Sequence, residues 1–223
     1  MRPLIFSMPW SAVFGAQLAR DWGEVGALNL HRFPDGESLV RLDTAVEQRE
    51  VVIVSSLHQP DTKIAPLLFA AQTARELGAR SVGLVAPYLA YMRQDHRFHA
   101  GEGVTAAQFA RLVSPHFNWL VTVDPHLHRY RALADIYSIP ATAVASAPAI
   151  AAWIRRELKQ PLLVGPDEES AQWVAAVAGM AQAPHMVLIK QRLGDREVKI
   201  QVPEVGRWKD HTPVLVDDII SSG

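Results

Sequence analysis

The chain of 223 residues contains no cysteine. This absence excludes disulfide bonds, thiolate catalysis and zinc sites built from cysteine, and it agrees with a reducing compartment, so we expect a cytoplasmic protein. Net charge is also nearly absent, because 22 Lys and Arg residues are balanced by 23 Asp and Glu residues. A chain with so weak an overall field is not expected to bind nucleic acid, and any phosphate binding must depend on local charge.

Long hydrophobic runs are missing as well. No apolar stretch approaches the roughly 18 residues of a membrane-spanning helix, and the first residues are too poor in apolar side chains for a secretory signal. We therefore expect no membrane partner. Hydrophobic residues still make up 49% of the chain, which is enough to build the core of one large or two small α/β domains.

Apolar, β-branched runs alternate with helical patterns along the whole chain, and this alternation favours an α/β fold with largely parallel sheets. The expected strands are 4–7, 27–33, 51–57, 82–87, 119–123, 142–145, 162–164, 186–190, 197–202 and 214–216. The expected helices are 11–22, 63–77, 105–113, 148–158 and 168–181. For the helix at 63–77 we predict Asp61 or Thr62 as N-cap and Gly78 as the C-terminal stop.

A domain boundary is predicted around residues 138–147, which are small, poor in charge and interrupted by Pro140. We expect an N-terminal α/β domain at 1–140 and a C-terminal α/β domain at 141–223. The two are interpreted as related units, although no internal sequence repeat is visible.

The end of the chain indicates a short strand buried on both faces, followed by Asp217 and Asp218. Carboxylates at the end of a parallel strand face a ligand more often than a core, and this pair suits two ribose hydroxyls. A turn of small residues follows and suits a phosphate. These residues are Ser221, Ser222 and Gly223. The metal-holding strand of a P-loop nucleotidase looks similar, but that class requires G-x-x-x-x-G-K-[ST], which the chain lacks.

Four other stretches gather polar residues at turns or strand ends, at 32–37, 87–97, 122–129 and 189–196. The first is by itself a strong Pro-Asp-Gly turn. The second places arginines, an amide and an acid at the end of a strand. Such a cluster is either a solvated loop or a site that binds a polyphosphate. The histidines of the third lack the spacing of a zinc pair, and the fourth is by itself a surface hairpin.

Taken in this order, these stretches and the terminal decapeptide resemble the ribose-phosphate pyrophosphokinase family over essentially the whole chain. The resemblance implies two phosphoribosyltransferase-type α/β domains. It implies an enzyme that transfers the diphosphoryl group of Mg-ATP to O1 of ribose 5-phosphate, giving 5-phosphoribosyl 1-pyrophosphate and AMP for nucleotide biosynthesis. The implied cofactor is Mg²⁺, and the implied partners are ATP, ribose 5-phosphate and further copies of this chain.

The resemblance also implies roles for individual residues. A turn that reaches into a neighbouring subunit's site would bind ATP through Phe33, Asp35 and Glu37. The other ATP-binding residues would be Arg93, Gln94, Asp95 and His126. Ribose 5-phosphate would be bound by Asp217, Asp218, Ser221, Ser222 and Gly223. The catalytic residues would be Lys190 and Arg192, and the metal would be held by His126 and Asp167. Asp167 equally suits the N-cap of the helix that follows it.

The chain departs from the family pattern in several places. His96 stands where the family has an arginine after Arg-Gln-Asp, and Arg97 follows one step later. The chain also stops before the final Gly-Thr of the terminal signature. We therefore expect a divergent, carboxyl-terminally truncated short form that keeps its ATP site and binds ribose 5-phosphate poorly. A type I phosphoribosyltransferase and a non-catalytic regulatory homologue stay open as alternatives.

Overall fold

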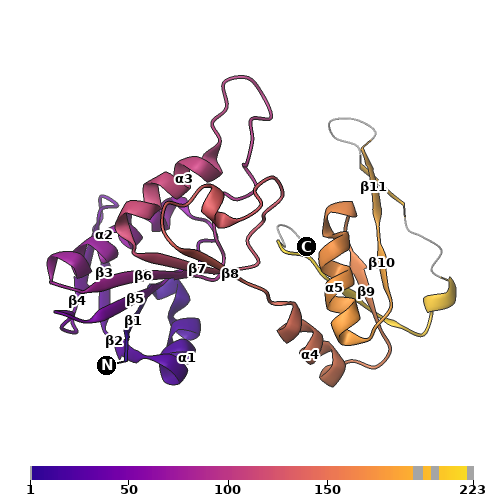
Figure 1. Cartoon of the computed structure of the whole chain (residues 1–223), viewed down its shortest axis with the longest axis horizontal. Coiled ribbons are helices and arrows are strands. Elements are labelled where there is room, and N and C mark those ends of the chain that lie inside the picture. The colour runs from indigo at the N-terminus through magenta and orange to yellow at the C-terminus, as the bar shows by residue number, and fades with distance from the viewer. Residues whose placement is uncertain (1, 193–197, 202–205, 220–223) are drawn as a thin grey trace. The chain divides into compact units, whose positions relative to one another are not determined.

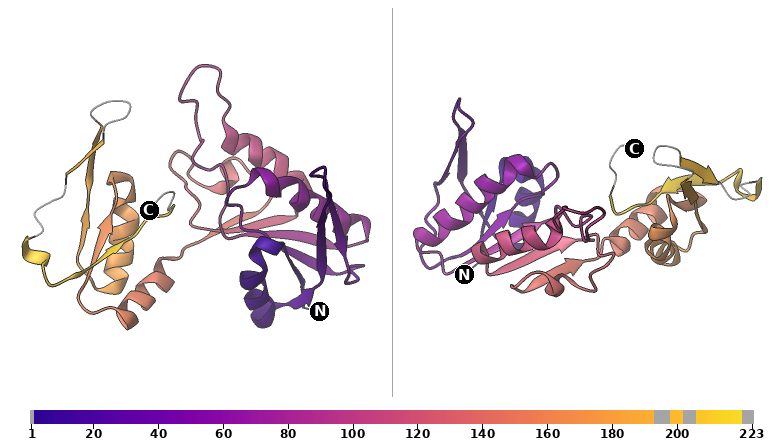
Figure 2. Two further views of the ribbon diagram at one scale, coloured as in Figure 1. Left: turned by 180° about the vertical axis from the view of Figure 1, so that it is seen from behind. Right: turned by 90° about the horizontal axis from the view of Figure 1, so that it is seen from above.

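The computed structural model describes residues 2–192, 198–201 and 206–219. The chain divides into two compact units, Met1–Val144 and Ala145–Gly223, which we call the first and the second unit. Each contains a parallel sheet with helices packed against it, which confirms the predicted fold class (Figures 1 and 2).

The first unit contains a sheet of six strands in the order β2-β1-β5-β6-β7-β8. Their bounds are Leu4–Ser7 (β1), Glu24–Gly26 (β2), Glu50–Val54 (β5), Ser81–Ala86 (β6), Trp119–Val123 (β7) and Ala141–Val144 (β8). All neighbouring strands pair in parallel. Their carboxyl ends therefore meet along one edge of the sheet, where ligand sites of open α/β sheets usually lie.

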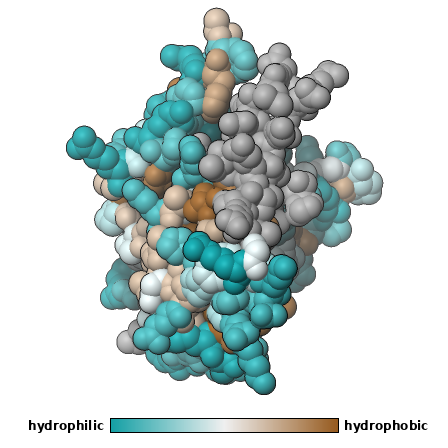
Figure 3. All heavy atoms as spheres, turned by 90° about the vertical axis from the view of Figure 1, so that its right-hand side faces the viewer, coloured by the Kyte–Doolittle hydropathy of each residue, from teal (hydrophilic) through white to brown (hydrophobic). Residues whose placement is uncertain are grey.

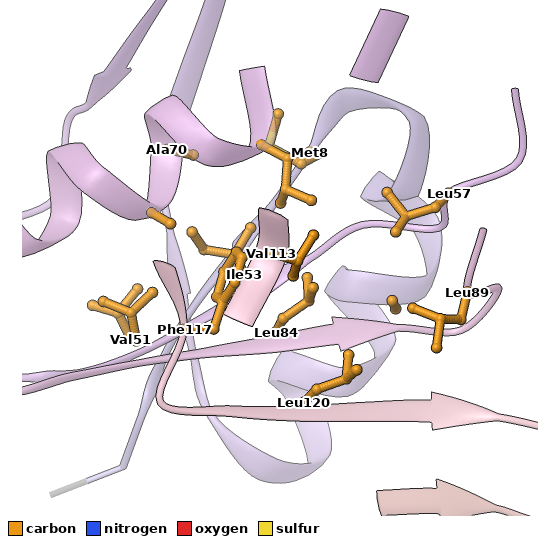
Figure 4. Close-up of a cluster of buried hydrophobic side chains, with 14 of the residues drawn as sticks. Met8, Val51, Ile53, Leu57, Ala70, Leu84, Leu89, Val113, Phe117 and Leu120 are labelled. Atoms are coloured by element: carbon orange, nitrogen blue, oxygen red, sulfur yellow. The ribbon is translucent and has the colours of Figure 1, made fainter. Parts of the chain in front are cut away.

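Three helices cover this sheet (Figure 1). They are α1 (Ala12–Trp22), α2 (Asp61–Glu76) and α3 (Thr105–Val113). Alternate residues of β1 point to opposite faces, so Phe6 joins the main core with side chains of α2 and α3, while Ile5 packs with Ala19 of α1. Figure 4 shows part of the main core, in which Ile53, Leu84 and their neighbours are fully buried. This packing holds the strand ends in fixed positions.

The ends of α2 correct one prediction and confirm another. The helix begins at Asp61, with Pro60 in the cap position and no side-chain hydrogen bond to the cap, so the predicted caps Asp61 and Thr62 are wrong. Gly78 has a φ of 86° just after the helix, a left-handed conformation that glycine adopts easily. The predicted stop at Gly78 is therefore confirmed.

An antiparallel hairpin, β3 (Leu28–Arg32) and β4 (Ser38–Leu42), also packs against α2. The predicted strand at 27–33 is thus confirmed as β3, whereas the short strand β2 that precedes it was not predicted. Short 3-10 helices lie at Pro9–Ser11, Ser114–His116, Leu133–Asp135, Glu168–Ser170 and Gly206–Trp208.

The second unit has a parallel sheet in which β9 (Pro161–Gly165) lies between β10 (His185–Val187) and β13 (Thr212–Leu215). Two helices, α4 (Ala147–Glu157) and α5 (Ala171–Ala181), pack against each other beside it. The strand predicted at 186–190 is instead two strands, because β10 ends at Val187 and β11 (Ile189–Arg192) pairs antiparallel with β12 (Val198–Gln201).

Strand β13 is not buried on both faces, so that prediction is wrong. Val214 and Val216 pack into the core of the second unit, but Leu215 is 59% exposed. The reason is that side chains of both α4 and α5 pack on the face that carries Val214 and Val216, whereas Leu215 points to the opposite face. On the face seen in Figure 3, the described residues carry mostly hydrophilic side chains, and apolar side chains appear in small patches.

Candidate functional site

The loop after β6 carries the predicted Arg-Gln-Asp group. Met92 is buried in the core, whereas Arg93 and Gln94 are exposed and Asp95 is buried again. The Gln94 N–H donates to the Tyr91 carbonyl at 3.0 Å, and the Gln94 carbonyl accepts from the Ala106 N–H of α3 at 3.2 Å. The loop is therefore anchored on both sides of two exposed polar side chains at the carboxyl edge of the sheet.

Asp95 is the most buried acid of this loop, with a side chain only 2% exposed. Its Oδ1 accepts a hydrogen bond from Arg129 Nη1 at 2.9 Å and lies 3.0 Å from His96 Nδ1. Burial acts to raise the pKa of Asp95, but the hydrogen bond to His96 and the charge of Arg129 outweigh it, so this pKa lies below its usual value. Asp95 is thus held as a carboxylate.

The neighbouring strand β7 leads into the loop of Asp124 and His126, and both side chains are half-buried. The Asp124 N–H donates to the Val144 carbonyl of β8 at 3.1 Å, and Asp124 has a φ of 35°. The His126 and His128 rings are stacked with their centres 6.1 Å apart. Because β6 and β7 are adjacent parallel strands, the Arg93 and Asp124 loops leave the same edge side by side.

A third loop at this edge follows β5 and is held by a lysine that the sequence analysis did not single out. Lys63 of α2 is only 6% exposed. Its ammonium donates to the carbonyls of Ser56 and His58 and lies 5.4 Å from the centre of the Trp10 ring. Burial lowers the pKa of Lys63. The sequence signal of such a residue is a charged side chain at a position of a predicted helix that faces the core.

The predicted Phe33–Glu37 turn lies at the tip of the β3–β4 hairpin, away from the loops after β6 and β7. The Phe33 N–H donates to the Glu37 carbonyl at 2.9 Å, and the Glu37 N–H donates to Asp35 Oδ1 at 3.0 Å. Gly36 has a φ of 91°, which the turn requires. Phe33 is 40% exposed, so an apolar ring and two carboxylates are presented at a closed, ordered turn.

In the second unit, carboxylates gather where β9 and β13 end. Asp167 follows β9, and its Oδ1 accepts from the Ser170 N–H at 3.2 Å, which confirms its predicted role as an N-cap. Asp217 follows β13 and accepts from the Asp218 N–H at 3.0 Å. Burial raises the pKa of Asp217, and the charges of Asp218 and Asp167 raise it further. The edge formed by two adjacent parallel strands therefore concentrates negative charge.

The remaining predicted site residues are described only in part. Lys190 and Arg192 lie on β11, and nothing is described of their side chains. Ser221, Ser222 and Gly223 lie outside the described residues. Within the described part of the chain, no group of three or more His, Cys, Asp or Glu residues is arranged to hold a metal ion. In the same part, no helix is long and apolar enough to span a membrane.

The chain matches a known protein family over half of its length. Residues 4–115 match the family described as the N-terminal domain of ribose phosphate pyrophosphokinase. The chain is 34% identical to the ribose-phosphate pyrophosphokinase of Methanopyrus kandleri over 212 residues, which are 94% of this chain and 72% of that protein. It is 31% identical to the enzyme of the same name from Methanobrevibacter smithii over 204 residues, 86% of this chain and 67% of that one.

The fold is similar to that of a solved structure. The crystal structure of phosphoribosylpyrophosphate synthetase from Mycobacterium smegmatis matches with a TM-score of 0.81. The match covers 98% of this chain and 72% of that chain. Since the two sequences are only 20% identical, the match shows a shared fold and nothing more.

Proposed function

The chain belongs to the ribose-phosphate pyrophosphokinase family, and on this basis we propose that it transfers the diphosphoryl group of Mg-ATP to O1 of ribose 5-phosphate and releases AMP. The observation that carries the proposal is the pair of adjacent loops after β6 and β7, which bring Arg93, Gln94 and His126 to one sheet edge. Such an edge is where an open α/β sheet binds phosphorylated ligands.

In the proposed reaction, O1 of the ribose attacks the β-phosphorus of ATP. A bond forms between these atoms, and the bond from the β-phosphorus to the oxygen that bridges it to the α-phosphate breaks. AMP leaves with this oxygen, and the hydroxyl proton is released to the solution. The first unit's share is to bind the nucleotide. Arg93 neutralises phosphate charge, and Gln94 donates hydrogen bonds. The aromatic face of Phe33 and the carboxylates of Asp35 and Glu37 suit the adenine and ribose of a nucleotide, held between two copies of the chain.

The second unit's share is to bind the acceptor. Asp217 and Asp218 accept hydrogen bonds from the ribose hydroxyls, which orients the sugar, while Ser221, Ser222 and Gly223 bind its phosphate. Lys190 and Arg192 offset the negative charge that develops on the transferring group. Water must be excluded while the bond forms, since hydrolysis of ATP would otherwise compete.

The donor set is compatible with Mg²⁺. This ion prefers oxygen ligands and is commonly held by one or two carboxylates together with substrate phosphates and water. Burial raises the pKa of Asp217, the charges of Asp218 and Asp167 raise it further, and a cation beside these carboxylates would offset the contribution of the charges. We propose that His126 in the first unit and Asp167 in the second unit each take part in metal binding, and Mg²⁺ when bound would neutralise phosphate oxygens.

The proposal is tested by incubating the protein with Mg-ATP and ribose 5-phosphate and measuring AMP and 5-phosphoribosyl 1-pyrophosphate. Equal amounts of both products are expected. Lys190→Met should lower the rate of their formation by about 10²-fold or more, while Lys159→Met, which changes an exposed lysine, should leave it unchanged. Release of pyrophosphate from 5-phosphoribosyl 1-pyrophosphate with a base as acceptor would instead indicate a phosphoribosyltransferase. ATP binding without either reaction would indicate a non-catalytic homologue.

A further inference from the structure

Two consecutive residues of the loop after β7 hold the loop after β6. Arg129 Nη1 donates to Asp95 Oδ1 at 2.9 Å, and the Tyr130 hydroxyl donates to the Asp95 carbonyl at 3.4 Å. These residues are separated from Asp95 by 34 and 35 positions in the sequence. The contacts therefore join two separate loops, each of which carries residues of the proposed nucleotide site.

Asp95 depends on this contact because its carboxylate is almost completely buried. Its second oxygen, Oδ2, has no hydrogen-bond partner within the described residues, so Arg129 and His96 supply the compensation at Oδ1. A buried carboxylate that loses its cation must either take up a proton or move towards water. Either response changes the loop immediately after Arg93 and Gln94.

We propose that Arg129 is a positioning residue, which fixes Arg93 and Gln94 for the nucleotide by pairing with Asp95. The inference rests on the proposed function, since it assumes that this loop binds Mg-ATP. Arg129 acts through Asp95 at the carboxyl-terminal end of the pair. The amino-terminal end is held independently, because Met92 is buried and the Gln94 N–H donates to the Tyr91 carbonyl. Removing Arg129 thus loosens the carboxyl-terminal end of the exposed pair, where the hydrogen bonds from Ala106 to the Gln94 carbonyl and from Tyr130 to the Asp95 carbonyl remain, and leaves the amino-terminal anchor intact.

The alternative is that Arg129 binds a phosphate directly, because its side chain is 47% exposed. A double-mutant cycle distinguishes the two possibilities. In the positioning case, Arg129→Met costs affinity only while Asp95 is charged, so its effect largely disappears when Asp95→Asn is already present. In the direct case, Arg129→Met costs the same in both backgrounds.

The experiment measures the Kd of Mg-ATP and the hydrogen exchange of residues 91–97 in the full chain, for the wild type, both single variants and the double variant. We expect Arg129→Met to raise the Kd by about tenfold or more, the scale expected when a buried charge pair is broken. We also expect it to speed exchange in this loop. Arg129→Lys, which restores the charge but not the planar fork, should recover part of both effects.

The matched control is Arg131→Met, which removes the same charge from an exposed arginine two positions further along. It should leave the Kd and the exchange unchanged. Additive losses of affinity in the cycle, or unchanged exchange at 91–97 in Arg129→Met, would overturn the proposal. A wild type that makes no AMP but keeps the coupling between Arg129 and Asp95 in affinity and exchange would refute the proposed activity and support the positioning role.

Discussion

The buried ammonium of Lys63 allows a quantitative prediction about the loop after β5. In Lys63→Met the hydrophobic stem is kept, but the carbonyls of Ser56 and His58 lose a charged donor. Net hydrogen bonds to charged groups contribute about 1.5–3 kcal/mol, and the desolvation of the ammonium offsets part of this. We expect the free energy of unfolding at neutral pH to fall by about 1–3 kcal/mol, as measured by urea denaturation.

The pH dependence of this difference gives a second, independent measurement. The pKa of Lys63 is lowered in the folded chain from an ordinary value of 10.5. Between the lowered pKa and 10.5 the unfolded chain binds more protons, so the wild type gains stability from this group as the pH rises through that window. Lys63→Met lacks this gain, and the stability difference between the two proteins should widen towards pH 10.5.

The exposed Lys159 provides the control, since Lys159→Met removes the same charge without affecting a buried group. Its stability should match that of the wild type within about 0.5 kcal/mol, as is usual for surface substitutions. Two results would refute the reasoning. If Lys63→Met is as stable as the wild type, the ammonium does not support the loop. If the difference is constant up to pH 10.5, Lys63 does not titrate from a buried position.

Three further predictions concern the second unit and the proposed catalysis. The raised pKa of Asp217 means that its contribution to stability is lost as the pH rises through that pKa, so Asp217→Asn should raise the Tm at neutral pH; a lower Tm would contradict the electrostatic argument. Lys190→Ala should lower kcat by about 10²-fold with ATP affinity nearly unchanged, and an equal loss of ATP binding would exclude a role confined to the transition state. A mixture of Phe33→Ala and Lys190→Ala chains should recover partial activity if the hairpin turn completes a neighbour's site. No recovery after confirmed subunit exchange would mean that each chain has a complete site.

Much of the scaffold follows from local sequence patterns. The strand at 119–123 and the helix at 105–113 have the predicted bounds. The apolar run of the strand and the 3.6-residue period of the helix are clear signals, because each ends at polar residues or a turn. The same reasoning was wrong for β13, since an apolar run does not reveal that the core lies on only one face of the strand. It also missed β2, which has only three residues.

The candidate site was predictable where a residue follows a strand directly. Arg93, Asp124 and Asp217 all come shortly after parallel strands, and the parallel arrangement brings their loops to a sheet edge within each unit. The supporting residues were not predictable in this way. Arg129 meets Asp95 across 34 positions, so no local pattern pairs the two, and the buried state of Asp95 follows from packing.

Backbone strain at the same edge has no sequence signal either. Tyr91 and Asp124 have φ values of 64° and 35°, in a region that costs non-glycine residues of order 1 kcal/mol or more. Tertiary contacts hold both residues there, because the Tyr91 hydroxyl donates to Asp61 of α2 and the Asp124 N–H donates to β8. A glycine at either position would adopt the same backbone without this cost. The two strained residues stand two positions before Arg93 and His126. The surrounding packing therefore imposes on these loops a shape that local backbone preference opposes, as is common where a chain binds its ligand.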